Sequence, residues 1–143
     1  MTDIGSGAQR QEVLAAMLRH ERALVAALAT DGVMVQPPDS LELPDDRLIT
    51  PPADRATMLE LVVPADAMAV ITAWEQALAH GVGFGHVHAR TDPDEALSLS
   101  FVDARDVHGV FLGALETLAS DAADHPQVLE TVPVSFLSWR YLR

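Results

Sequence analysis

The stretch VGFGHVHARTDPDEALSLSFVDARDVHGVFLGAL, residues 82–115, decides the fold, because its apolar and polar residues follow the two-residue period of β-strands. Residues 82–91 and 97–103 both alternate, and an acidic turn separates them. Residues 107–115 are apolar on both faces, which is typical of a central strand that is covered on both sides. We therefore predict three neighbouring strands joined by short turns, an antiparallel meander.

A long helix precedes these strands. Val63-Pro64-Ala65-Asp66 places a proline in the first helical turn, where its fixed backbone angle favours a helix start. Apolar residues then recur at helical spacing as far as His80, and Gly81 ends the helix. The glycines at 83 and 85 indicate that another element packs closely against the strand that follows.

The N-terminal part of the chain has helical spacing. Apolar residues from Leu14 to Leu28 recur every three or four positions, so we predict one amphipathic helix over residues 8–30, ended by Gly32. Residues 1–7 are small and polar, and we expect them to be disordered. A short strand at residues 33–35 and a proline-rich loop over residues 36–55 come next.

Composition excludes several classes of protein. The 143 residues are enough for one domain, and 49% of them are hydrophobic, which allows a real core. The net charge of −12 repels phosphate backbones and anionic lipid, so we expect no nucleic-acid and no membrane partner. There are no cysteines, no signal-peptide pattern and no apolar run of the roughly 20 residues that span a bilayer. These features predict a cytoplasmic domain.

The order of the predicted elements and several motifs resemble a PAS domain. Residues 61–66 (LVVPAD), the helix that ends in ALAHG at 77–81 and the hairpin of residues 84–103 are similar to the central part of that family. Residues 101–105 (FVDAR) and 108–113 (HGVFLG) resemble the last strands of PAS-like modules that precede diguanylate cyclase domains in actinobacteria.

The resemblance implies an α+β fold, a PAS-like antiparallel sheet with an N-terminal amphipathic helix and a long connecting helix. Within that fold, residues 31–118 are the PAS-like domain, and residues 119–143 are a C-terminal extension or connector. It also implies a non-catalytic sensory and dimerisation input domain of a bacterial signalling protein, followed by an output domain.

Aromatic residues indicate where a ligand would bind. The candidates for a small-molecule pocket under the sheet are Trp74, Phe84, Phe101 and Phe111. The alternative is that these side chains fill the core without leaving a cavity. The sequence identifies no cofactor: no cysteine is present for a flavin adduct, and no histidine lies on the apolar face of the helix at 64–80 to bind haem.

The N-terminal apolar stripe is longer than a small sheet needs, and one face of residues 107–115 requires a cover from outside the core. We therefore predict a homodimer. Its interface candidates are Leu14, Met17, Leu18, Leu24, Val25 and Leu28. The alternative is that this helix packs on the sheet of its own chain.

Histidines raise a second reading. His86 and His88 project from one face of a strand, but no further ligand lies at matched spacing, so we predict no metal site. With Asp103 they could supply the His/Asp pair of a small cone-shaped α+β isomerase or hydratase. We prefer the non-enzymatic reading, because these residues lie in polar or turn settings; a scaffold without any ligand is a third alternative.

Overall fold

The computed structural model describes residues 2–117, with side chains described from residue 9 onward. The helices are α1 (Thr2–Arg19), α2 (Ala67–His80) and α3 (Arg105–His108), and the short 3-10 segments are η1 (Asp45–Arg47), η2 (Met58–Leu61) and η3 (Pro64–Asp66). The strands are β1 (Leu24–Leu28), β2 (Met34–Val35), β3 (Leu48–Ile49), β4 (Val82–His88), β5 (Ala96–Ala104) and β6 (Val110–Thr117).

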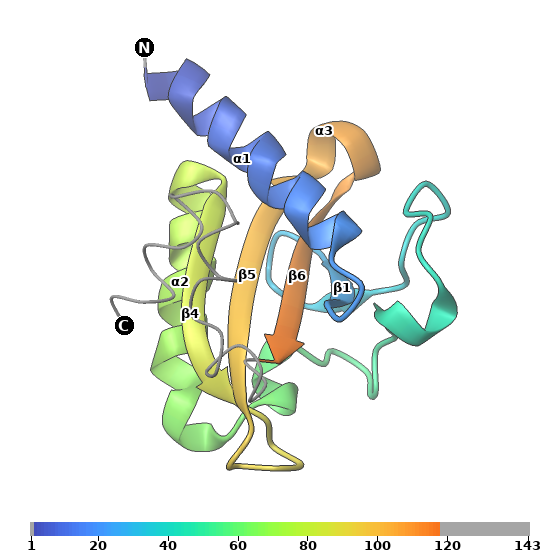
Figure 1. Cartoon of the computed structure of the whole chain (residues 1–143), viewed down its shortest axis with the longest axis vertical. Helices are drawn as coiled ribbons and strands as arrows, with labels where there is room; N and C mark the ends of the chain where they lie inside the picture. Colours follow the sequence, from blue (N-terminus) through green and yellow to red (C-terminus); the bar gives the residue numbers. More distant parts are fainter. Residues whose placement is uncertain (1, 118–143) are drawn as a thin grey trace.

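The strands form one sheet with the order β2-β1-β6-β5-β4 (Figure 1). All pairs in this order are antiparallel, and β3 adds a short parallel pairing with β1. The predicted α+β class, the antiparallel sheet and the long connecting helix are therefore confirmed. Among the described residues, the chain offers no helix with the length and apolar character that crossing a membrane requires.

A helix covers each face of the sheet (Figure 1). The inner face, under α2 and η2, carries Leu28, Leu99, Phe101 and Phe111. The outer face, under α1, carries mainly valine, leucine and alanine from β1, β5 and β6. Because side chains alternate along each strand, every central strand contributes to both cores.

The glycines of β4 explain how α2 lies against the sheet. A Cβ at position 83 would lie 1.8 Å from the carbonyl oxygen of Ala73, so only glycine fits between helix and strand. A Cβ at position 85 would lie 3.3 Å from the carbonyl oxygen of Ala69, a milder contact. The close packing predicted from these glycines is confirmed.

The prediction of one helix over residues 8–30 is wrong. The helix ends at Arg19, and Leu24–Leu28 forms β1, a central strand between β2 and β6. A short, continuous apolar run fits a buried strand as well as a helix, so its periodicity did not distinguish the two. The domain boundary at residue 31 is wrong for the same reason, because the sheet already needs β1.

Arg47 fixes the point at which α1 ends. Its guanidinium donates to the carbonyl oxygens of Met17 (3.0 Å), Leu18 (2.9 Å) and Ala23 (3.0 Å). The last carbonyl oxygens of a helix have no hydrogen-bond donor within the helix. A cation that donates hydrogen bonds to them therefore stabilises the helix end. The polar residues 20–22 then turn the chain into β1.

Two further sequence predictions require correction. The structure places residues 2–7 in α1, where the sequence predicted disorder; no proline occurs before Pro37 to interrupt a helix. The last strand begins at Val110 and not at residue 107, because α3 occupies residues 105–108. The predicted connector at 119–143 lies outside the described residues.

Most of the predicted dimer candidates are occupied within the chain. Met17 and Val25 are buried in the outer core, Leu28 is buried in the inner core, and Leu14 and Leu18 pack against the outer core. On the face of β6 that needed a cover, Leu112 and Ala114 share one core with Val13 and Met17 of α1. Of the six candidates, Leu24 alone is well exposed, at 42%.

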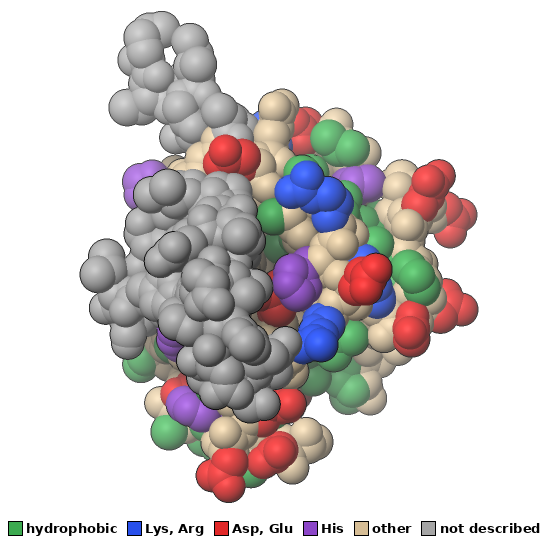
Figure 2. Space-filling model, in the orientation of Figure 1, with side chains coloured by type: hydrophobic (Ala, Val, Ile, Leu, Met, Phe, Trp, Pro, Cys, Tyr) green, Lys and Arg blue, Asp and Glu red, His purple; other side chains and the backbone are tan. Residues whose placement is uncertain are grey.

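Acidic side chains gather along one edge of the molecule, over the loop between β2 and β3 (Figure 2). The exposed carboxylates of this loop are Asp39, Glu42, Asp45 and Asp46. They concentrate part of the net negative charge on a loop whose Leu41 is buried in the outer core.

Replacing Gly83 by alanine tests the contact between α2 and β4. The new Cβ meets backbone, so the helix must move, and overpacking of this kind costs about 1–3 kcal/mol or more of unfolding free energy. Urea denaturation measures the loss. Gly85→Ala is the matched control and should cost clearly less; equal stabilities of the two variants would contradict the packing described here.

Candidate functional site

Three of the four predicted pocket aromatics meet on the inner face. The Trp74 ring of α2 makes an edge contact with Phe101 of β5, with centroids 5.2 Å apart, and contacts Phe111 of β6 at 4.9 Å. Both phenylalanines are fully buried, whereas Trp74 is half-buried. The cluster therefore joins the core to the surface through one tryptophan.

Phe84 is not part of this cluster. It pairs with Ser100 across β4 and β5 and packs into the outer core, while Gly83 pairs with Phe101. Placing Phe84 in the pocket was wrong, because paired residues share a face and neighbouring residues do not. The glycines at 83 and 85 were the signal: they mark the face that α2 approaches, so Phe84 must point the other way.

A cleft of about 180 Å³ opens beside Trp74, where α2, η2 and the turn after β1 meet. We name it the Trp74 cleft. Its apolar walls are Met58, Leu59, Val70, Ile71, Trp74 and Phe101. Gly32, in a left-handed backbone conformation with φ 85°, lets the turn approach the indole ring.

The polar groups of the Trp74 cleft are engaged with the protein itself. The Thr57 hydroxyl donates to Glu60 Oε2 (3.0 Å) and accepts from the Leu59 amide (3.1 Å). One oxygen of Asp31 accepts from the Val33 amide. The lining of the cleft is therefore mainly apolar, with Asp31 and Thr57 as its polar members.

The structure does not assemble the predicted His/Asp pair. His88 lies at the end of β4 that pairs with Ala96, whereas Asp103 lies at the far end of β5. His88 Nδ1 instead lies 2.9 Å from Asp66 Oδ2, which also accepts the His88 amide at 2.7 Å. This pair ties η3 to β4 and borders none of the clefts described here.

Histidine and carboxylate side chains do not converge in a metal-binding geometry in the part of the chain that the structure describes. His86 and His88 do share one face of β4, as the sequence predicted, but the described residues bring no set of three ligands together.

An ionic cluster, which we name the α1 latch, fastens α1 to the corner between β5 and α3. Arg10 Nη1 donates to Asp106 Oδ1 (2.8 Å) and to the Asp103 carbonyl oxygen (3.0 Å). Arg105 binds both carboxylate oxygens of Asp103, at 2.9 and 2.8 Å. Asp103 and Arg105 lie two residues apart, whereas Arg10 lies far away along the chain and no sequence pattern pointed to it.

These ion pairs shift the acidities of both aspartates. The hydrogen bond from Arg105 lowers the pKa of Asp103, and the hydrogen bond from Arg10 lowers the pKa of Asp106. Both carboxylates are therefore ionised at neutral pH. The Arg105 guanidinium also lies over the Phe111 ring, 4.8 Å from its centroid, so the latch contacts the aromatic cluster.

No family model matches the sequence, and no curated protein matches it. Among solved structures, the chain is similar to the PAS domain of a protein from Colwellia psychrerythraea. The two share 11% sequence identity with a TM-score of 0.46, and the similarity covers 77% of this chain and 97% of that one.

Proposed function

We propose that this chain is a non-catalytic sensory module of a bacterial signalling protein, and that a small apolar molecule in the Trp74 cleft is its ligand. The cleft supports this proposal because it presents mainly aromatic and aliphatic surface to solvent. Apolar cavities of about 150 Å³ bind molecules the size of benzene, so its volume suits a ligand of that class.

One observation carries the proposal: an unbroken series of contacts joins the cleft to α1 on the opposite face. Trp74 contacts Phe111, and Phe111 lies under the Arg105 guanidinium. Arg105 holds the Asp103 carboxylate, and Arg10 of α1 donates to the Asp103 carbonyl oxygen. A shift of the indole ring can therefore reach the latch through side chains in direct contact.

The proposed mechanism is a shift between two populations. A ligand that prefers one position of Trp74 stabilises that position by its difference in affinity for the two states. If the latch is stronger in one state, binding changes how firmly α1 is held. The likeness of residues 101–113 to modules that precede diguanylate cyclase domains is our reason for proposing a signalling context with an output domain.

Toluene tests the Trp74 cleft directly. In a chain carrying Trp139→Phe, Trp74 is the remaining tryptophan, and we expect its emission to change saturably as toluene is added. Ile71→Phe fills the cleft and should abolish the change. Leu78→Phe, on the same helix but away from the cleft, is the control and should leave the change intact. Emission that stays constant at every toluene concentration would refute the ligand site.

Asp106→Asn tests the latch. Loss of this exposed ion pair should speed amide hydrogen exchange in residues 9–19 by roughly two- to fivefold, while exchange in β5 and β6 stays slow. Asp54→Asn removes the same charge elsewhere and should have no effect on α1. If both variants exchange alike, Arg10 and Asp106 do not hold the helix.

Acid should release the latch as well. The pKa of Asp106 is lowered in the folded protein, so its contribution is complete above the ordinary aspartate pKa of about 3.9. The contribution is lost as the pH falls through the lowered folded-state pKa. Exchange measured on the same segment should therefore lose its dependence on Asp106 in strong acid.

The homodimer also remains a proposal, and Leu24 is the predicted interface residue that stays exposed. Native mass spectrometry should show a dimer for the unmodified chain and a monomer for Leu24→Glu. Leu78→Glu, at an exposed leucine of α2, serves as the control and should stay dimeric. A monomeric unmodified chain would show that the homodimer proposal is wrong.

A further inference from the structure

A second, larger cleft lies on the other side of η2 from the Trp74 cleft. Its volume is about 400 Å³, within the range of pockets that bind small molecules, and no residue lines both clefts. We name it the Arg90 cleft. Aliphatic side chains from η2 and the strands form its walls: Leu24, Ile49, Leu61, Leu97 and Leu115.

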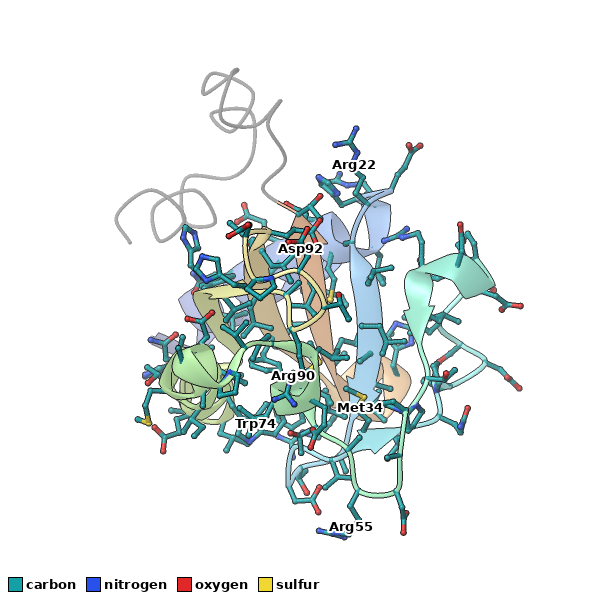
Figure 3. All side chains as sticks on the ribbon, turned by 90° about the horizontal axis from the view of Figure 1, so that it is seen from below. Arg22, Met34, Arg55, Trp74, Arg90 and Asp92 are labelled. Carbon is teal, nitrogen blue, oxygen red and sulfur yellow. The ribbon has the colours of Figure 1, made fainter. Side chains whose placement is uncertain are left out.

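Arg90 follows β4 and presents a fixed guanidinium to this cleft. Its Nε donates to the Val62 carbonyl oxygen (3.0 Å) and its Nη2 to the Leu59 carbonyl oxygen (3.2 Å). These two bonds hold the side chain on the inner side of the sheet, on the same side as Trp74 (Figure 3). In the described part of the chain, Nη1 has no hydrogen-bond acceptor, and Arg90 has no ion-pair partner.

Two carboxylates, Glu60 and Glu95, also border the cleft, and the positive charge of Arg90 adds to the Thr57 hydrogen bonds that lower the pKa of Glu60. The carboxylate of Glu60 accepts from the Thr57 amide (2.7 Å) and hydroxyl, so it is turned toward the N-terminus of η2. Glu95 is exposed in the turn between β4 and β5. Arg22 adds a second cation to the lining, apart from Arg90 in Figure 3.

We propose that the Arg90 cleft binds an amphipathic carboxylate, a molecule with one carboxylate and an aliphatic chain. The carboxylate lies against the outer edge of the guanidinium, where Nη1 and the second Nη2 proton form a fork of matching geometry. The aliphatic chain lies along the leucine and isoleucine walls and is removed from water there. This site goes beyond the sensory proposal, because it shares no lining residue with the Trp74 cleft.

Calorimetric titration of the full chain with three matched probes tests the chemistry. Octanoate should bind saturably, and octanol and octylamine, which have the same chain with a neutral or cationic head group, should bind at least tenfold more weakly. Equal affinities for all three would show that the cleft does not select a carboxylate. A failure of octanoate to bind, or a preference for octylamine at the glutamates, would overturn the proposal outright.

Variants then assign the site to Arg90. Arg90→Gln should weaken octanoate binding by about tenfold or more, in keeping with the loss of a hydrogen bond to a charged group. Arg55→Gln is the matched control: it removes an exposed arginine that does not line the cleft, and it should bind octanoate as the unmodified chain does. If both variants bind equally well, the proposal is wrong.

Arg90 also supports the backbone, so Arg90→Gln could weaken the fold itself. Ile49→Ala avoids this difficulty, because Ile49 is half-buried, lines the cleft and is not one of the proposed dimer-interface residues. We expect octanoate to bind severalfold more weakly. An unchanged octanoate affinity would contradict the proposed position of its aliphatic chain along this wall.

The two ligand proposals fail separately. Toluene reports on Trp74 emission, whereas octanoate binding is read from heat. If the protein binds octanoate but shows no toluene response, the Arg90 cleft proposal stands and the Trp74 cleft proposal is wrong. If it responds to toluene but does not bind octanoate, the Trp74 cleft proposal alone stands.

Discussion

The contact between Gly83 and the backbone of Ala73 is the constraint on which the rest of the structure depends. It brings the axis of α2 so close to β4 that no side chain fits between them. This depth of packing sets the position of Trp74, one residue further along the helix, and lets its ring reach Phe101 on β5 and Phe111 on β6, the second and third strands from the β4 edge. A helix held farther away would leave the aromatic cluster unformed.

The same packing leaves space at the ends of the inner face. The core of the inner face is filled by residues such as Leu28, Val87 and Leu99, all fully buried. Solvent-accessible clefts remain where α2 gives way to η2 and to the turn after β1. The sequence left two alternatives open, a ligand cavity under the sheet or a completely filled core. The structure has a filled core and clefts at the edges of the inner face.

Local signals made part of this fold predictable. The proline at 64 and the glycine at 81 bound a helix by their backbone preferences, and the alternation in residues 82–103 defines a hairpin. The strand at 24–28 lacked such signals, since its apolar run has no alternation and follows a helix without a glycine or proline between them. Its identity is set by pairing with β6, more than eighty residues away, which periodicity cannot show.

The candidate site was predictable to the same extent. Trp74, Phe101 and Phe111 meet because helix spacing and strand alternation place each on an apolar face, which the sequence does show. Arg10 and Arg90 could not be found in that way, because each is defined by partners brought near only by the tertiary fold: Asp106 for one, the carbonyls of Val62 and Leu59 for the other. Charged residues on a surface carry no periodic signal.

The segment η2 connects the two proposed ligand sites physically. The Leu59 side chain lines the Trp74 cleft, and the Leu59 carbonyl oxygen accepts a hydrogen bond from Arg90. A capping box stabilises this short segment: the Thr57 side chain accepts a backbone hydrogen bond, and the Glu60 side chain accepts one from the Thr57 amide. A carboxylate bound to Arg90 therefore lies one hydrogen bond from the residue that a ligand beside Trp74 contacts. If binding at Arg90 shifts η2, each ligand changes the affinity of the other by the same factor, because coupling between two binding sites is reciprocal.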